Sequence, residues 1–120
     1  MNTLEIGKAI ASLLTVPSFA FYAPSNTLQS FVVYQLTGLS PATTKDRYSY
    51  KEKATVTLKA VAGTYEESVR LAQTIRDTLE PFEGEISGIE IDEILLLDAR
   101  AESAYLDSYV HILTYQITIV

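Results

Sequence analysis

Ala54-Thr-Val-Thr-Leu-Lys-Ala-Val-Ala62 is followed by Gly63 and then by Thr64-Tyr-Glu-Glu-Ser-Val-Arg-Leu-Ala-Gln-Thr-Ile-Arg-Asp-Thr-Leu79. This stretch decides the fold. Its first part alternates apolar and polar residues, which predicts a strand with one buried face. Gly63 permits a tight reversal, and Thr64 with Glu67 has the spacing of a capping box at a helix N-terminus. The helix is predicted to bury a stripe at helical spacing: Val69, Ala72, Ile75 (or Arg76) and Leu79. The stretch therefore predicts a strand, a turn and a helix, and it carries no reactive group.

The rest of the chain predicts one further helix and three further strands. Thr3 to Val16 has a broad apolar face and is ended by Pro17, which predicts a helix. Strands are predicted over Ser30 to Thr37, Ile86 to Leu97 and Ser108 to Val120. The element order is then α-β-β-α-β-β. We expect residues 1–120 to form a single α+β domain, a four-stranded, mostly antiparallel sheet with two helices packed on one face.

The composition of the 120 residues excludes several classes of function. With 48% hydrophobic residues the chain belongs to the globular class. It has no cysteine, which excludes a disulfide framework, a thiolate zinc site and a cysteine nucleophile. A net charge of −6 argues against a nucleic-acid binder, because phosphate contacts need clustered Lys and Arg. Neither a signal peptide nor a transmembrane helix is expected.

The charge is unevenly distributed along the chain. Residues 1–60 hold six basic and three acidic groups, a local net charge of +3. Residues 61–120 hold three arginines and twelve acidic groups, a local net charge of −9. One interpretation is a solvated acidic face. The other is a polar subunit that meets its neighbour head to tail, basic side against acidic side.

Few residues carry reactive chemistry. His111 is the only histidine, and its place in the middle of a predicted strand is typical of a packed residue. Glu90, Asp92, Glu93 and Asp98 could in principle hold a hard cation. Strand alternation sends two of them, Asp92 and Glu93, to opposite faces, so we expect no metal site. The chain also has no phosphate loop and no hydrolase motif. We therefore expect neither an enzyme nor a cofactor.

The segment from Gly38 to Ser49 is predicted to be the one long irregular connection. At about a dozen residues it exceeds the usual length of ~4–6, and connections this long are often functional. We expect its polar part to form an interface or channel loop: Thr43, Thr44, Lys45, Asp46, Arg47 and Tyr48.

Several pieces of the chain, in their order, carry a resemblance to a known family. They are Phe19-Ala-Phe-Tyr-Ala-Pro24 in the place of Val-Tyr-x-x-Ala-Pro, Phe31-Val-Val-Tyr-Gln35 in the place of Tyr-Val-Val-Tyr-Gln, Ala60-Val-Ala-Gly-Thr-Tyr65, the helix Glu66 to Leu79, and a closing strand with alternating aromatic residues. Together they resemble the tail completion proteins of long-tailed bacteriophages, also called tail terminator or tail-to-head joining proteins. The chain departs from the family pattern at Ser18, where an Arg is frequent, and in the more acidic turn Ala99 to Asp107.

The resemblance implies a structural function in the virion tail. Such proteins form a ring, typically a hexamer, at the head-proximal end of the tail tube. The ring ends tube polymerisation and joins the tail to the head connector, so the implied partners are further copies of the chain, the tail tube protein and the connector protein. From the net charge and the lack of a membrane-spanning stretch we expect neither a membrane nor a sequence-specific nucleic acid as a partner. In such rings a long loop projects into or beside the channel, and Leu39 to Tyr48 is the segment that matches.

Two rival functions remain open from the sequence. The first is a small dimeric α+β ligand-binding or regulatory module that pairs through an exposed final strand, because an edge strand of that length needs a partner. The second is a small hydrolase or isomerase that uses His111 with a carboxylate.

Overall fold

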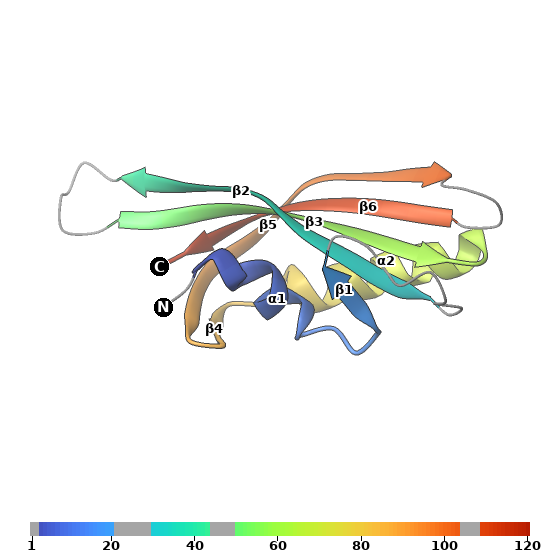
Figure 1. The fold of residues 1–120 in the computed structure, drawn as a ribbon, viewed down its shortest axis with the longest axis horizontal. Helices are drawn as coiled ribbons and strands as arrows, with labels where there is room; N and C mark the ends of the chain where they lie inside the picture. The colour runs from blue at the N-terminus through green and yellow to red at the C-terminus, as the bar shows by residue number, and fades with distance from the viewer. Residues whose placement is uncertain (1–2, 21–29, 44–49, 104–108) are drawn as a thin grey trace.

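The computed structural model describes residues 3–20, 30–43, 50–103 and 109–120. Within them the elements are a 3₁₀ turn η1 (Thr3–Glu5), then α1 (Ile6–Ala11), β1 (Ser18–Ala20), β2 (Phe31–Thr43), β3 (Tyr50–Ala62), α2 (Tyr65–Leu79), β4 (Gly84–Ile86), β5 (Ile89–Ser103) and β6 (Tyr109–Ile119). The molecule is elongated, 51 × 23 × 21 Å, with the long strands running along its length (Figure 1).

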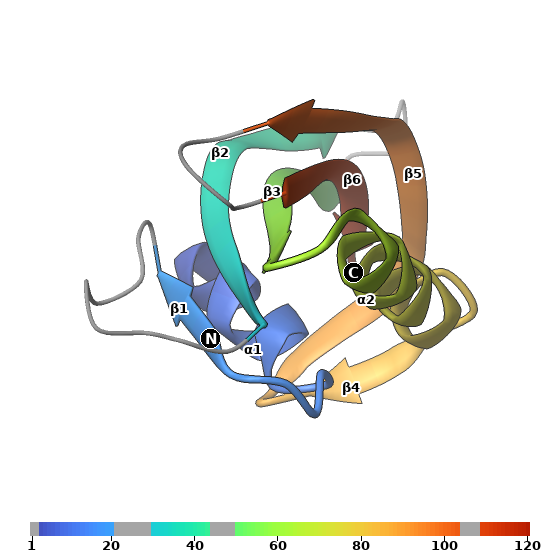
Figure 2. The same ribbon diagram turned by 90° about the vertical axis from the view of Figure 1, so that its right-hand side faces the viewer.

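The strands form one six-stranded sheet in the order β1-β2-β3-β6-β5-β4. β1 runs parallel to β2, and every other neighbouring pair is antiparallel. The sheet curls strongly, and both helices lie inside the curl (Figure 2). The prediction of a four-stranded, mostly antiparallel sheet in the order α-β-β-α-β-β is therefore wrong, because the sheet has six strands and is mixed and curled.

The two strands that the sequence did not predict are each three residues long. β1 contains the first two residues of the segment Phe19 to Pro24, and its Ser18 pairs with Val32 of β2. β4 and β5 are joined by Ser87 and Gly88, both with positive φ (53° and 81°), and Ile86 pairs with Ile89. This is the geometry of a type I′ hairpin turn. The predicted strand from Ile86 to Leu97 is thus the end of β4, a turn and most of β5.

β2 continues through Gly38 and Pro41, two residue types that usually interrupt a strand. A register shift between Leu36 and Gly38 interrupts the pairing with β3, which resumes and continues to Thr43 opposite Tyr50. Pro41 is tolerated because this part of β2 lies at the edge of the sheet, where proline removes no required ladder hydrogen bond. The prediction that the chain from Gly38 to Ser49 is irregular is wrong for residues 38–43.

β6, the last strand of the chain, lies in the interior of the sheet. It pairs with β3 along one side and with β5 along the other. The Val120 amide continues this pairing by donating to the Glu90 carbonyl at 2.9 Å. The final strand is therefore not an exposed edge, and the dimer contact expected for a ligand-binding module is wrong.

The β3–α2 unit follows its sequence pattern closely. Thr64 is the N-cap of α2, and its hydroxyl accepts a hydrogen bond from the Glu67 amide at 3.2 Å, which confirms the Thr64 half of the predicted capping box. The helix buries Ser68, Leu71, Ala72, Ile75 and Leu79. Val69 was predicted to be buried, but it is 40% exposed. The buried stripe is rotated away from Val69 because Ser68 and Leu71 face the sheet instead.

The first helix is shorter than predicted. Thr3 to Val16 contains the turn η1 and the six-residue helix α1, which ends at Ala11 with Ser12 as its C-cap. Close packing on β2 occurs at Gly7, where an added Cβ would lie 3.2 Å from the Tyr34 ring.

A single apolar core fills the space between the concave side of the sheet and the helices. The buried row of β3 is confirmed, because Ala54, Val56, Leu58 and Ala60 have no exposed surface. The other buried members come from α1, α2 and the remaining strands: Ile6, Ala9, Ile10, Val32, Leu71, Ala72, Ile75, Leu79, Ile86, Ile89, Ile91, Ile94, Leu113, Tyr115, Ile117 and Ile119.

Candidate functional site

The predicted interface loop lies at the end of the arm formed by β2 and β3. Thr43 is the last residue of β2 and pairs with Tyr50, the first residue of β3. These paired ends lie at one extremity of the long axis (Figure 1). The other predicted residues, Thr44, Lys45, Asp46, Arg47 and Tyr48, lie outside the described residues. The structure therefore fixes the base of the candidate loop.

His111 is half-buried on the concave side of β6, where it contacts the first turn of α2. Its Nδ1 lies 2.9 Å from the Ser68 hydroxyl oxygen. That hydroxyl donates its proton to the Tyr65 carbonyl at 2.7 Å. Since serine has one proton to donate, the imidazole supplies the hydrogen between the two side chains, with Nδ1 protonated. Ser68 is fully buried, so this pair connects α2 to β6 and presents no accessible nucleophile.

The first turn of α2 also carries an exposed aromatic surface. Tyr65 and Tyr109 are 54% and 41% exposed, and their rings lie 6.2 Å apart, nearly perpendicular. The Tyr65 ring also lies 5.5 Å from the His111 ring. A pocket of about 240 Å³ opens beside the two tyrosines; Tyr65, Ala101, Glu102, Tyr109 and Val110 line it. We call it the tyrosine pocket.

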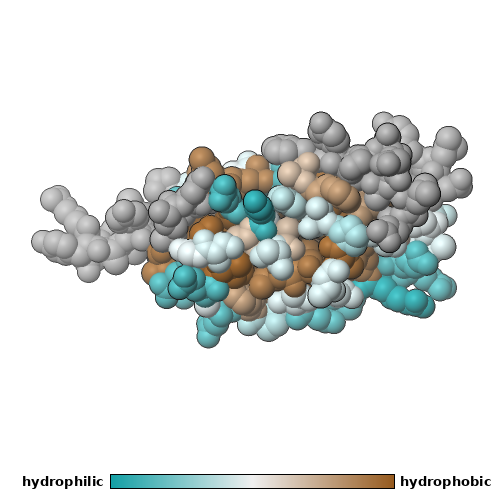
Figure 3. Space-filling model, turned by 60° about the horizontal axis from the view of Figure 1, so that its bottom comes forward, coloured by the Kyte–Doolittle hydropathy of each residue, from teal (hydrophilic) through white to brown (hydrophobic). Residues whose placement is uncertain are grey.

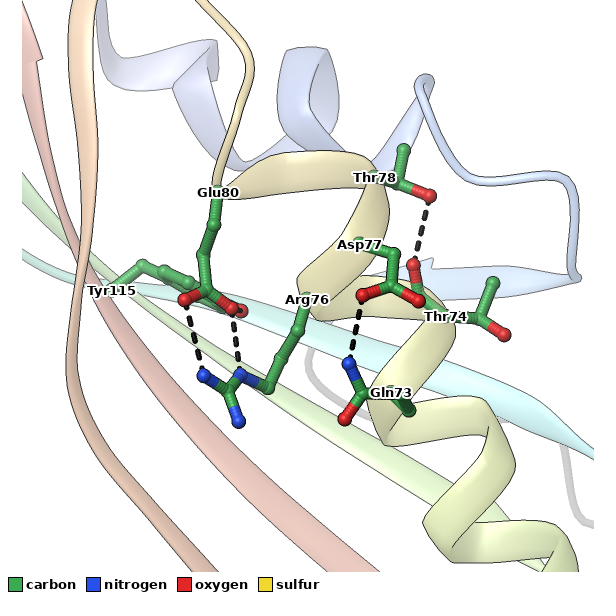
Figure 4. A network of polar contacts seen from close by, with 7 residues as sticks. All are labelled: Gln73, Thr74, Arg76, Asp77, Thr78, Glu80 and Tyr115. Atoms are coloured by element: carbon green, nitrogen blue, oxygen red, sulfur yellow. Dashed lines mark hydrogen bonds and ion pairs between the residues drawn. The ribbon is translucent and has the colours of Figure 1, made fainter.

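The other end of α2 is connected to β6 by a polar network (Figure 4). Arg76 donates to the Glu80 carboxylate at 2.7 Å, and the Tyr115 hydroxyl donates to the same carboxylate at 3.3 Å. The hydrogen bond and charge of Glu80 raise the pKa of Arg76. Burial, together with the Glu80 charge, raises the pKa of the Tyr115 phenol well above its usual range. The Arg76–Glu80 pair closes the last turn of α2, and the Tyr115 contact holds that turn on the sheet, so the role of the network is structural.

Two long stretches of sheet edge have no strand partner among the described residues. β1 covers only Val32 to Tyr34 of β2, and β4 covers only Ile89 to Ile91 of β5. The outer side of β5 from Glu93 onwards is therefore an open edge. Leu95 and Leu97 in this part of β5 are 46% and 50% exposed. Open edges of this length are sites where another chain can pair.

A second apolar surface lies on the face that carries α1. Figure 3 shows hydrophobic groups in the middle of this face, with hydrophilic groups along its margins. Leu4 is exposed there, and Leu13, Leu14 and Val16 are half-buried against the core. A concave patch that includes Leu4, Lys8 and Tyr34 opens beside α1.

Neither a metal centre nor a membrane-spanning helix is found in the part of the chain that the structure describes. No group of three or more His, Asp or Glu side chains in residues 3–20, 30–43, 50–103 and 109–120 could hold a metal ion. Over the same residues, no helix has the length and apolarity needed to span a bilayer.

The sequence did not predict the tyrosine pocket. Tyr109 and His111 share a face of β6, which the period of two indicates. Their contact with Tyr65 depends on how α2 crosses the sheet, and no local pattern specifies that crossing. The available signal was a tyrosine directly after the N-cap, three residues before the buried Ser68 and therefore at the margin of the helix face that meets the sheet.

Comparison with known proteins identifies a shared fold. No protein-family model matches the chain, and no curated protein sequence matches it. Among solved structures, a chain in the virion of a native gene transfer agent particle matches with a TM-score of 0.67. The match covers 92% of this chain and 83% of that chain at 15% sequence identity. At this identity the likeness shows the fold alone.

Proposed function

We propose that this chain is a structural protein of a phage-like virion. The observation that carries the proposal is the shared fold with a gene transfer agent virion chain over nearly the whole length of both chains. The order of sequence pieces that resemble tail completion proteins supports the same class independently. On this proposal the protein acts by binding other virion proteins and catalyses no reaction.

The finer proposal is a ring at the head-proximal end of the tail tube. In this role the chain ends tube polymerisation and joins the tail to the head connector, with a hexamer as the expected assembly. Its partners are further copies of itself, the tail tube protein and the connector protein, and its location is the virion tail. A ring requires two different surfaces on each subunit. The elongated subunit offers distinct ends and open sheet edges, and the two halves of its sequence carry opposite net charge.

The experiment is a complementation assay in a particle-producing host that lacks this gene. We expect its absence to give tails of irregular length and heads without tails, and the wild-type gene to restore joined particles. Electron microscopy measures the tail-length distribution and the fraction of joined particles. Normal, joined particles in the absence of the gene would refute the proposed function.

The candidate loop can be tested in the same assay. Because Thr43 and Tyr50 are paired, residues 44–49 can be replaced by Asn-Gly, which forms a two-residue hairpin turn. We expect a folded protein, checked by thermal unfolding, that fails to restore joining. A matched control replaces Ser87 by Asn, which gives Asn-Gly at the β4–β5 hairpin and keeps its turn type. Full restoration by the shortened variant would exclude residues 44–49 from the contacts.

A further inference from the structure

We propose that the tyrosine pocket binds a basic side chain from the β2–β3 arm of a second copy of this chain. The inference rests on the proposed ring and assigns one of its contacts. It follows from the chemistry of the pocket, the position of the arm and the charge of each. The contact would hold one end of a subunit against the opposite end of its neighbour.

The chemistry of the pocket suits a cation. Two tyrosine rings at 79° to each other present π faces and edges at its wall, and a lysine or arginine side chain is attracted to such faces. Glu102 adds a carboxylate at the same pocket. The partial positive charge of the α2 N-terminus is opposed by Glu66 and Glu67 in its first turn. A guanidinium can stack on a ring and pair with the carboxylate at once.

The rest of the pocket is apolar, which strengthens the preference. Ala101 and Val110 complete its lining, so a cation that enters exchanges water for aromatic and aliphatic contacts. Attraction between a cation and a ring increases when water is removed. The apolar stem of a lysine or arginine side chain can pack against the aliphatic wall, a contact that a small free ammonium ion cannot make.

The basic arm is the matching surface. Between residues 45 and 53 the sequence has four of its nine basic residues and two acidic ones, Asp46 and Glu52. Lys51 and Lys53 belong to β3, and Lys45 and Arg47 lie outside the described residues. By contrast, the pocket end carries Glu66 and Glu67 in the first turn of α2 and Glu102 in the pocket lining. Complementary charges of this kind favour the encounter of unlike ends and disfavour the meeting of like ends.

The arm of one copy cannot reach its own pocket. β3 begins at Tyr50 in the arm and ends at Ala62, which pairs with Tyr109 of the pocket. Twelve residue steps along a strand span about 40 Å. Figure 1 places the arm and the N-terminal end of α2 at opposite ends of the molecule. The basic side chain that occupies the pocket must therefore come from another copy.

The contact joins two different surfaces, so it propagates from copy to copy. A heterologous contact closes into a ring when its rotation allows closure. The alternative of two pockets facing each other would bring the Glu102 carboxylates of both copies together. This contact is thus compatible with a ring and disfavours a two-fold dimer through the pocket.

Cysteine cross-linking tests the contact, because the chain has no cysteine of its own. The double variant Arg47→Cys with Glu102→Cys is oxidised at the highest soluble concentration and separated without reductant. We expect a ladder of dimers, trimers and larger species. The two single variants are the matched controls, because each can form no more than a disulfide-linked dimer. Absence of species above the dimer in the double variant overturns the proposal.

A second measurement needs no engineered bond. Self-association is followed by analytical ultracentrifugation for Tyr65→Ala and for Val69→Ala, an exposed position one turn further along α2 outside the pocket. Loss of the Tyr65 ring is expected to weaken association between about 2-fold and about 30-fold, the range of a cation–π contact. Glu102→Lys should also weaken it, and adding Arg47→Glu should restore it. Equal association of Tyr65→Ala and Val69→Ala overturns the proposal.

The complementation assay separates this inference from the proposed function. In one outcome, cross-linked species above the dimer form in the double variant, but removal of the gene changes neither tail length nor joining. That outcome supports the contact and refutes the tail role. In the other outcome, removal of the gene impairs joining, and genes carrying Tyr65→Ala or Glu102→Lys restore it fully. That outcome supports the tail role and refutes the contact.

Discussion

Replacing Tyr115 by Phe tests the polar network at the end of α2 through its pH dependence. The Tyr115 side chain is fully buried, and its hydroxyl lies 3.3 Å from the Glu80 carboxylate. Burial and that negative charge raise the phenol pKa in the folded protein above the value of about 10 found in unfolded chains. The stability from the neutral phenol is therefore complete below pH 10 and is lost as the pH rises above it.

The size of the effect follows from proton linkage. Above pH 10 the unfolded chain releases this proton while the folded protein keeps it, so the free energy of unfolding falls by about 1.4 kcal/mol per pH unit. Between pH 8 and pH 11 the wild-type protein should lose about 1.4 kcal/mol through Tyr115. Tyr115→Phe should lack this loss, and at pH 8 it should be less stable by about 1 kcal/mol because one hydrogen bond is gone.

Urea unfolding at pH 8 and pH 11 measures both quantities. Ile117→Val is the matched control, because it destabilises the same face of β6 by about 1 kcal/mol and leaves the phenol in place. The control should keep the wild-type pH dependence. An equal loss of stability between the two pH values in wild type and Tyr115→Phe would refute the reasoning.

Three further substitutions test the fold. Thr64→Ala removes the acceptor of the Glu67 amide at the start of α2 and should cost about 1 kcal/mol in urea unfolding; an unchanged midpoint would show that the cap does not matter. Ile75→Ala leaves a cavity at a fully buried position and should cost about 2–5 kcal/mol in the same assay, whereas Thr74→Ala on the exposed side should cost far less. Gly88→Ala forces a side chain onto a backbone with φ of 81° and should cost about 1–2 kcal/mol. Gly63→Ala, where no atom lies within 4 Å of the added Cβ, should cost less, and the opposite ranking in thermal unfolding would contradict the turn assignment.

Local patterns predicted the parts of the fold that local chemistry determines. The buried row of β3 follows from alternation, and the start of α2 follows from the Thr64 cap. The short edge strands of the sheet and the angle at which α2 crosses the sheet could not be predicted from local patterns. β1 and β4 are too short to bury a pattern of their own, and they exist because β2 and β5 offer them an edge. Pro41 indicates a break in an isolated segment, yet at a sheet edge it costs no hydrogen bond.

The candidate site was predictable to a similar degree. The sequence identified a polar segment whose base the structure places at the tip of an arm, with Thr43 paired to Tyr50. The charge difference between the two halves was also visible in the sequence. The tyrosine pocket was not, because it requires Tyr65 of α2 to lie over Tyr109 of β6, which are separated by more than forty residues.

The central position of β6 has a consequence for folding during synthesis on the ribosome. β6 is the last of the described strands to be synthesised, yet it alone connects the β1-β2-β3 half of the sheet to the β5-β4 half. Until Tyr109 to Ile119 emerge, β3 and β5 each expose a side that the finished sheet covers, and such sides are prone to pair with other chains. Premature termination before β6 should therefore yield aggregates and no partly folded subunit. Completed chains alone would then enter assembly, which excludes incomplete subunits.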